Sequence, residues 1–278
     1  MQTKRHNYEY AVDTASQTAP ANVVRLIGTN KRVLEIGCGP GSITKILSEQ
    51  NGCIVTGLEL DPIAIEKVKP FCEVVKQADL NSPDWPRLLD GIEKFDVVLA
   101  ADVLEHLYDP QKSLQQMIPL MKDNGCIVIS LPHIGHAAIL SCLISGNFKY
   151  GDWGLLDRTH IRFFCLQNIE NLFTQANLKI IEAKFVTKTP SETEFAEVWA
   201  SMPHAVQDVL MTPKHANVYQ VVIKAVPINR IDSAIMLIPP AFTYQPHGLS
   251  IKTWIGQYLN ASLKSIIRSA FNRIGLKI

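Results

Sequence analysis

Short apolar runs separated by helix-like stretches organise the first half of this chain. The runs are nearly continuous and rich in β-branched residues: Arg32–Gly37, Cys53–Leu58, Phe95–Ala100 and Cys126–Leu131, with a weaker one at Cys72–Ala78. Such runs are typical of strands that are buried on both faces of a sheet. The helix-like stretches between them are Gly41–Gln50, Pro62–Val68 and Gln111–Met121. This alternation predicts an α/β fold with a parallel sheet and right-handed crossovers.

The second half continues the pattern and adds an insertion. A helix is predicted over residues 166–177, followed by strands at Lys179–Val186 and Val218–Ala225. Between these strands the chain makes an excursion of about 30 residues, and Glu192–Ser201 and His204–Met211 within it are helix-like. So long a connection between neighbouring strands suggests a cap over a site.

Composition narrows the class of protein. The 278 residues allow one large domain, or one domain with an appendage, and a hydrophobic fraction of 47% is ample for a buried core. A net charge of +1 argues against nucleic acid as a partner. The six cysteines form no CxxC pair, the first residues lack the apolar stretch of a signal peptide, and no apolar run approaches the length of a membrane span. We therefore expect a cytoplasmic protein with reduced thiols.

A glycine-rich turn follows the first predicted strand. Gly37, Gly39 and Gly41 lead from that strand into a helix, an arrangement that lets a ligand approach backbone N–H groups. Ser42 occupies the position where the dinucleotide fingerprint requires its last glycine, which argues against a nicotinamide-dependent oxidoreductase. Glu35, two residues before the turn, suits a ligand with a cationic amino group, although a purely structural role in capping the helix or pairing with a lysine is the alternative.

Acidic residues stand where the following strands end, which is the edge at which open α/β sheets bind ligands. Glu59, with Leu60 beside it, ends the second strand, and its carboxylate suits two ribose hydroxyls. Asp79 and Leu80 follow the third strand and suit an adenine ring, although a structural Asx turn is the alternative for Asp79. The segment Asp102–Leu107 (DVLEHL) follows the fourth strand.

Together these motifs resemble a class I S-adenosylmethionine-dependent methyltransferase over roughly residues 25–225. The resemblance implies a Rossmann-like sheet of seven strands in the order 3-2-1-4-5-7-6, the last antiparallel, with helices on both faces and a helical lid. It also implies that S-adenosylmethionine binds and that S-adenosylhomocysteine is the product, and we expect no metal-binding residues. The cofactor-binding residues that it implies are Glu35, Gly37, Cys38, Gly39, Gly41, Glu59, Leu60, Asp79, Leu80 and Ala101.

A second motif concerns the acceptor. Residues 154–164 match the pattern G-x-L-D-x-T-H-x-R-F-F of a methyltransferase subgroup associated with polysaccharide and O-antigen-type biosynthesis. In that subgroup the loop after strand five reads P-N-x-x-H, whereas this chain has His133 in place of Asn. The resemblance implies O-methylation of a sugar-type hydroxyl on a small-molecule or glycan acceptor. A lipid, a quinone or another natural product is an alternative acceptor, and a non-catalytic protein that binds the cofactor is an alternative function.

An alcohol acceptor needs a base, and histidine is the usual one near neutral pH. Four histidines follow the fourth and fifth strands and are the catalytic candidates: His133, which we prefer, His136, His160 and His106. Each also has a structural alternative, for example a polar network of His160 with Asp157. The resemblance further implies that an arm carrying Tyr8 and Tyr10 closes over the cofactor.

Charge divides the chain into two parts. Beyond Asp232, the last acidic residue, five basic residues give the tail +5 and leave −4 for the rest. We expect residues 1–228 to form the methyltransferase domain, with a lid at 134–164 and a helical insertion at 190–216, and residues 229–278 to form a connector and a basic amphipathic helix. Such a helix (247–278) can dock on its own domain, form a homodimer or lie peripherally on the inner face of a membrane.

Overall fold

The computed structural model describes residues 8–247, and the fold is a seven-stranded sheet in the order β3-β2-β1-β4-β5-β7-β6. The strands are β1 (Arg32–Ile36), β2 (Ile54–Glu59), β3 (Val74–Gln77), β4 (Phe95–Ala101), β5 (Met121–Pro132), β6 (Leu178–Thr187) and β7 (Val218–Pro227). All neighbouring pairs are parallel except those of β7, which runs antiparallel to both β5 and β6. The predicted strand order and the antiparallel last strand are confirmed.

Eight α-helices lie in the described part of the chain. They are α1 (Ala19–Ile27), α2 (Ser42–Glu49), α3 (Pro62–Val68), α4 (Pro110–Met117), α5 (Ala137–Ile144), α6 (Leu166–Gln175), α7 (Ala196–Ser201) and α8 (His204–Leu210). Helix α3 has the bounds that were predicted from the sequence, Pro62–Val68. The helix predicted to reach Met121 ends four residues earlier, because Pro119 lies in a 3-10 turn after Met117 and Met121 already pairs with Phe95 in the sheet.

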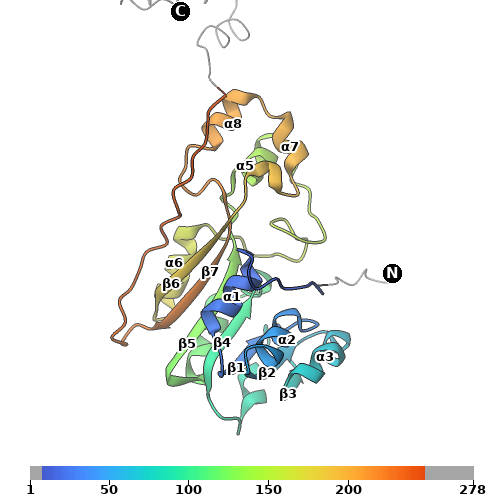
Figure 1. The fold of residues 1–278 in the computed structure, drawn as a ribbon, viewed down its shortest axis with the longest axis vertical. Coiled ribbons are helices and arrows are strands. Elements are labelled where there is room, and N and C mark those ends of the chain that lie inside the picture. The colour runs from blue at the N-terminus through green and yellow to red at the C-terminus, as the bar shows by residue number, and fades with distance from the viewer. Residues whose placement is uncertain (1–7, 248–278) are drawn as a thin grey trace, which may run out of the picture.

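Helix α1 is an element that the sequence analysis did not predict. It has nine residues, Pro20 lies in its first turn, and seven of its side chains are buried. It packs with α2 on one face of the sheet (Figure 1). Val23 of α1 and Leu47 of α2 belong to the same apolar cluster. The opposite face is covered by α4 and α6, which pack against a larger cluster that includes Trp85 and Phe173. Burial of both faces explains why the strands read as continuous apolar runs.

The connectivity reverses direction between β1 and β4. From β1 the chain passes through α2 to β2 and β3 on one side, and β4 then pairs on the other side of β1. A ligand crevice forms at the carboxyl ends of the strands where such a reversal occurs. The glycine turn at residues 37–41 lies at this point.

The lid and the insertion form one small helical unit. Helix α5, which follows β5, packs against α7 and α8 from the insertion between β6 and β7, and Figure 1 shows the three helices together at one end of the molecule. The lid is helical only in α5, while residues 145–165 contain no helix. Gly154 has a φ of 89°, a Cβ there would collide with the carboxylate of Glu194 in the insertion, and the neighbouring Leu155 N–H donates to that carboxylate at 2.7 Å. The lid and the insertion are therefore held in close contact.

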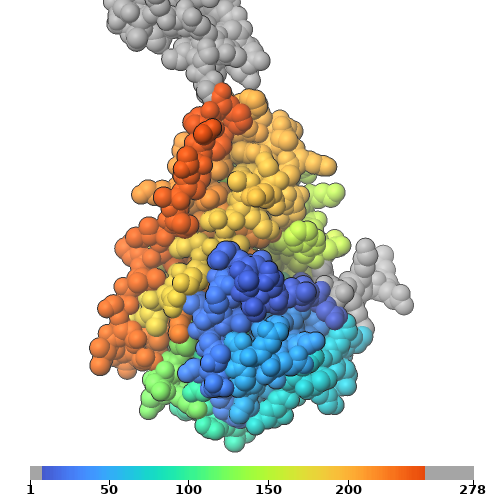
Figure 2. All heavy atoms as spheres, viewed as in Figure 1, coloured from blue at the N-terminus to red at the C-terminus, as the bar shows by residue number. Residues whose placement is uncertain are grey.

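The segment after β7 lies along the surface of the domain. Leu237 is buried in the main core cluster, and its backbone N–H donates to the Glu170 carboxylate on α6. Further along, Tyr244 donates to Asp208 on α8, so residues 229–247 run from the sheet to the lid unit (Figure 2). The predicted amphipathic helix lies outside the described residues. Within residues 8–247 no helix combines the length and apolarity that a membrane span requires.

Candidate active site

The turn after β1 brings two backbone N–H groups to the end of β2. The N–H groups of Gly37 and Cys38 both donate to the carbonyl of Leu58, at 2.8 and 3.1 Å. Gly37 and Gly39 have φ values of 69° and 53°, which L-residues rarely adopt. A Cβ on Gly37 would lie 2.7 Å from Val103, whereas no atom of the described residues lies within 4 Å of a Cβ placed on Gly39. The turn is therefore packed on one side and open on the other.

Glu59 lies against this turn. Its Oε2 accepts the Gly39 N–H at 2.7 Å, and its Oε1 accepts the N–H groups of Leu60 and Asp61 at 2.7 and 2.9 Å. Three amides thus hold the carboxylate at the carboxyl end of β2. The open space at Gly39 and the adjacent carboxylate fit a ligand that carries a ribose.

The side chains of Glu35, before the turn, and of Cys38, within it, are both buried. Glu35 is buried and accepts the Thr44 hydroxyl at 2.7 Å, and burial raises the pKa of its carboxyl group to about 8. The hydrogen-bond partner of Glu35 is thus Thr44 on α2. An ammonium group of a ligand beside Glu35 would favour the ionised form of its carboxyl group. Burial also raises the pKa of the Cys38 thiol, which suits a packing residue and disfavours a nucleophile.

The adenine candidates lie after β3. Asp79 Oδ1 accepts the N–H of Asn81 at 2.9 Å, which is the Asx turn considered as its structural alternative. Asp79 is exposed, and Leu80 packs partly buried against the main core cluster. The turn places both residues at the ligand-binding edge of the sheet.

The end of β4 is tied to two other strands. Asp102, directly after Ala101, has a φ of 53°. Its Oδ1 accepts the Ser130 hydroxyl at 2.6 Å, and both carboxylate oxygens accept from the Gln220 amide at 3.1 Å. The unusual backbone is thus stabilised by β5 and β7, next to Ala101, which the resemblance assigns to cofactor binding.

The N-terminal arm lies across this edge of the sheet. The Tyr10 N–H donates to the Ser42 hydroxyl at 3.0 Å, and the Tyr8 hydroxyl contacts Asp157 and Thr159 of the lid at 3.4 and 3.5 Å. Burial, followed by the charges of Asp102 and Glu35, raises the pKa of Tyr10. The arm therefore joins the turn to the lid.

Two of the candidate histidines are almost fully buried and contact main-chain groups. His136 accepts the Ala138 N–H through Nδ1 at 3.1 Å, which caps α5, and its Nε2 contacts the Lys188 carbonyl at 2.9 Å. Both ring nitrogens are engaged, so we leave His136 out of the proposed mechanism. His133, the base preferred from the sequence, is 1% exposed, and its Nδ1 contacts the Val218 carbonyl at 3.2 Å.

These two histidines predict a pH dependence of stability. Burial lowers the pKa of both His133 and His136 from 6.5 to about 4. Between these values the unfolded chain binds protons that the folded chain does not. The free energy of unfolding should therefore fall as the pH drops from 6.5 toward 4, by up to about 1.4 kcal/mol per pH unit for each histidine. Urea unfolding of wild type and His136→Asn, which keeps a good N-cap residue, measures this. An unchanged slope in the variant would contradict the prediction.

The other two candidates form a cluster with a residue that the sequence analysis did not select. His160 Nε2 lies 3.9 Å from Oε1 of Glu105, and the His106 and His160 rings are 4.9 Å apart. Glu105 is fully buried, and neither of its carboxylate oxygens has a hydrogen-bond partner among residues 8–247. Burial, followed by the charge of Asp102, raises the pKa of its carboxyl group well above 4.5. In the sequence, the feature that could have indicated Glu105 as a site residue is its position next to His106 in the segment Asp102–Leu107.

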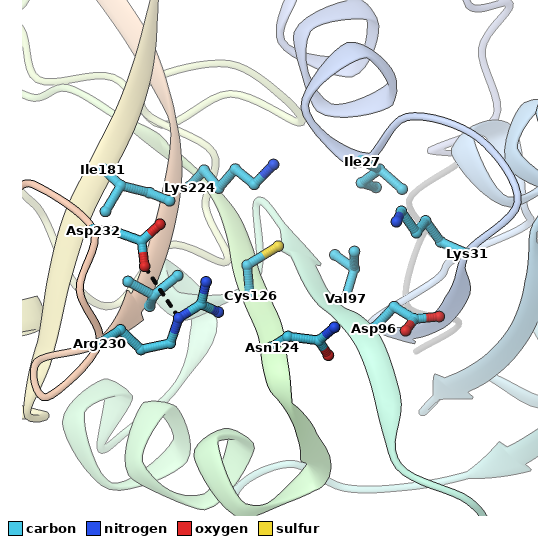
Figure 3. Close-up of a pocket in the computed structure, with 11 residues that line it drawn as sticks. Ile27, Lys31, Asp96, Val97, Asn124, Cys126, Ile181, Lys224, Arg230 and Asp232 are labelled. Atoms are coloured by element: carbon cyan, nitrogen blue, oxygen red, sulfur yellow. Dashed lines mark ion pairs between the residues drawn. The ribbon is translucent and has the colours of Figure 1, made fainter.

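A separate cavity lies at the opposite edge of the sheet. It has a volume of about 240 Å³ and is lined at the starts of β4 and β5 and the end of β7, by Asp96, Cys126 and Lys224 among others (Figure 3). Lys31 and Arg230 also line it, and Arg230 pairs with Asp232 at 3.0 Å. The cavity is remote from the glycine turn and is not the candidate active site.

The strand order, the glycine turn at the reversal point and the acidic strand ends define the class of protein: a class I S-adenosylmethionine-dependent methyltransferase. The family described as a methyltransferase domain matches residues 5–183, and the chain belongs to this family. Its cofactor is therefore S-adenosylmethionine.

Curated relatives and solved structures agree with this class. The chain is 23% identical over 167 residues to a ubiquinone biosynthesis O-methyltransferase of Coxiella burnetii, which covers 59% of this chain and 70% of the relative. It is 30% identical over 138 residues to the protein of the same name from Histophilus somni, covering 44% and 58%. A S-adenosylmethionine-dependent methyltransferase structure from Archaeoglobus fulgidus has a TM-score of 0.51 at 20% identity, covering 74% of this chain and 91% of that one. This structural likeness concerns the fold alone.

Proposed function

We propose that this protein transfers a methyl group from S-adenosylmethionine to a hydroxyl oxygen of a small-molecule acceptor. The cluster of Glu105, His106 and His160 beside the end of β4 carries the proposal. A hydroxyl loses a proton when its oxygen is methylated, and imidazole and carboxylate groups assist that loss near neutral pH. An acceptor that reacts as a carboxylate has no need of such a buried polar cluster.

The chain's own residues bind and align the two reactants in this proposal. Glu59 holds the ribose, Asp79 and Leu80 the adenine, and the turn from Gly37 to Gly41 the methionine end. S-adenosylmethionine, when bound, supplies an activated methyl group and leaves as S-adenosylhomocysteine. Because the sulfonium is already activated, alignment and exclusion of water are the main contributions of the protein. The contact between Tyr8 and the lid supports an enclosed site.

For the acceptor we propose a hydroxyl on an aromatic ring, as in a quinone precursor. The names of the curated relatives favour this acceptor over the sugar-type hydroxyl expected from residues 154–164. A phenolic hydroxyl also ionises more readily than a sugar hydroxyl, since its pKa is near 10. A sugar-type or glycan hydroxyl remains the alternative to be tested beside it.

A matched set of acceptors tests the proposal. The purified chain is incubated with S-adenosylmethionine and a prenylated catechol, the same compound with its hydroxyls already methylated, or a nucleotide sugar. Mass spectrometry follows the gain of a methyl group, and release of S-adenosylhomocysteine is measured in parallel. We expect methylation of the catechol alone. Methylation of the sugar alone overturns the aromatic acceptor, while cofactor binding without transfer to any acceptor favours a non-catalytic, cofactor-binding protein.

A further inference from the structure

The buried carboxylate of Glu105 has no hydrogen-bond partner among residues 8–247, although buried polar groups are normally hydrogen-bonded. The side chain is fully buried, and neither oxygen accepts a hydrogen bond from the described residues. A buried polar group without a partner costs free energy, and buried charges are normally paired or bound to metal. Asp102 and Asp157 add negative charge nearby. Among residues 8–247, no lysine or arginine pairs with Glu105, and the one basic side chain paired with it is His160, at 3.9 Å.

The two neighbouring histidines are oriented as metal ligands are. Nδ1 of His106 lies 3.1 Å from the Thr159 carbonyl, and Nδ1 of His160 lies 3.3 Å from the Leu155 carbonyl. A carbonyl oxygen only accepts, so each Nδ1 donates, and in a neutral ring of this tautomer the lone pair is on Nε2. Histidine ligands typically donate their other ring N–H to a backbone carbonyl in this way. For His160 the lone pair is on the nitrogen 3.9 Å from Glu105.

We propose that Glu105, His106 and His160 bind a divalent transition-metal ion that contacts the acceptor hydroxyl. The ligand atoms offered by the three residues all lie within 4.8 Å of one another. Two imidazoles and one carboxylate are a common donor set for zinc and for other first-row ions with open positions. When the bonds from the metal ion to its ligand atoms are about 2.0–2.2 Å long, two neighbouring ligand atoms lie roughly 3–3.5 Å apart. The three side chains would therefore move about 1 Å closer to one another when the ion binds.

The position of this metal site gives the ion a role in the reaction, and that role rests on the proposed function. Glu105 and His106 lie in the 3-10 turn Leu104–His106 that comes after β4, whose last residue, Ala101, the resemblance assigns to the cofactor. An ion there binds the acceptor oxygen, lowers the pKa of its hydroxyl and lets the proton pass to water. The oxygen then forms its bond to the methyl carbon as the carbon–sulfur bond breaks. The sequence had predicted no metal, so the proposal departs from that expectation.

Metal binding can be measured without an acceptor. The full chain, stripped with a chelator and dialysed, is titrated calorimetrically with Zn²⁺, and Co²⁺ absorption reports the ligand set. We expect one equivalent to bind, and Glu105→Gln or His160→Asn to weaken binding by roughly 100-fold or more. His247→Asn is the matched control, since His247 also lies against a carboxylate, 3.0 Å from Asp208, but is exposed. It should bind as wild type does.

The outcomes separate this inference from the proposed function. Melting curves without metal verify that both variants fold, and Zn²⁺ should raise the melting temperature of wild type but not of Glu105→Gln. No binding to wild type, or equal binding to all variants, overturns the metal site. Metal binding at the three residues with no methylation of any hydroxyl leaves the site standing and overturns the proposed function. Methylation by metal-free protein at an unchanged rate overturns the role of the ion.

Discussion

Glu59→Gln is expected to weaken binding of S-adenosylhomocysteine by about 100-fold. Hydrogen bonds to a charged group contribute about 1.5–3 kcal/mol each, and a carboxylate that accepts from two ribose hydroxyls makes two of them. The substitution also places an amide NH₂ group where Oε1 or Oε2 now accepts backbone N–H groups at 2.7 Å. A donor would then face a donor, so the turn itself becomes less well held. Calorimetric titration with S-adenosylhomocysteine measures the change.

An exposed glutamate gives the matched control for this substitution. Glu66 on α3 is exposed and pairs with Lys69 at 3.9 Å. Glu66→Gln makes the same chemical change outside the candidate site and should leave cofactor affinity as in wild type. If Glu59→Gln binds the cofactor as tightly as this control, Glu59 does not hold the ribose.

Alanine at Gly37 should mainly reduce stability, whereas alanine at Gly39 should mainly reduce cofactor binding. At Gly37 a Cβ would lie 2.7 Å from Val103 in a left-handed backbone, and we expect a loss of about 2–4 kcal/mol in the free energy of unfolding. At Gly39 the backbone is also left-handed, but the space is open, and the loss should be about 1–2 kcal/mol. Cofactor binding should nevertheless be reduced by about tenfold or more, because the added methyl group occupies the ligand's space.

Two measurements on each variant separate these effects. Urea unfolding gives stability, and calorimetry under conditions where both variants remain folded gives cofactor affinity. Gly52→Ala is a useful comparison, since Gly52 also has a positive φ (63°) but lies in the loop before β2. It should lose stability and keep cofactor affinity. Wild-type affinity in a folded Gly39→Ala variant would contradict the placement of the cofactor at this turn.

Much of the fold could be predicted because burial leaves a periodic trace in the sequence. Strands covered on both faces are continuously apolar, and α3 begins at a proline after Asp61, whose side chain caps it at 2.9 Å from the Ile63 N–H. Helix α1 also has a proline in its first turn, Pro20, but no side chain caps its N-terminus, and it was not predicted. Its stability comes from packing on the sheet with α2, which is a tertiary effect.

The sequence by itself determined which segments form the strands and which residues follow the ends of the strands, among them Glu59, Asp79 and Asp102. These follow from local patterns, since a strand must end where its apolar run ends. The tertiary structure alone decided which histidines meet a carboxylate: His160 approaches Glu105 across 55 positions of sequence, whereas His136 caps a helix. The physical reason is that the partners of a side chain on a lid depend on how distant segments pack, and no local periodicity records that packing.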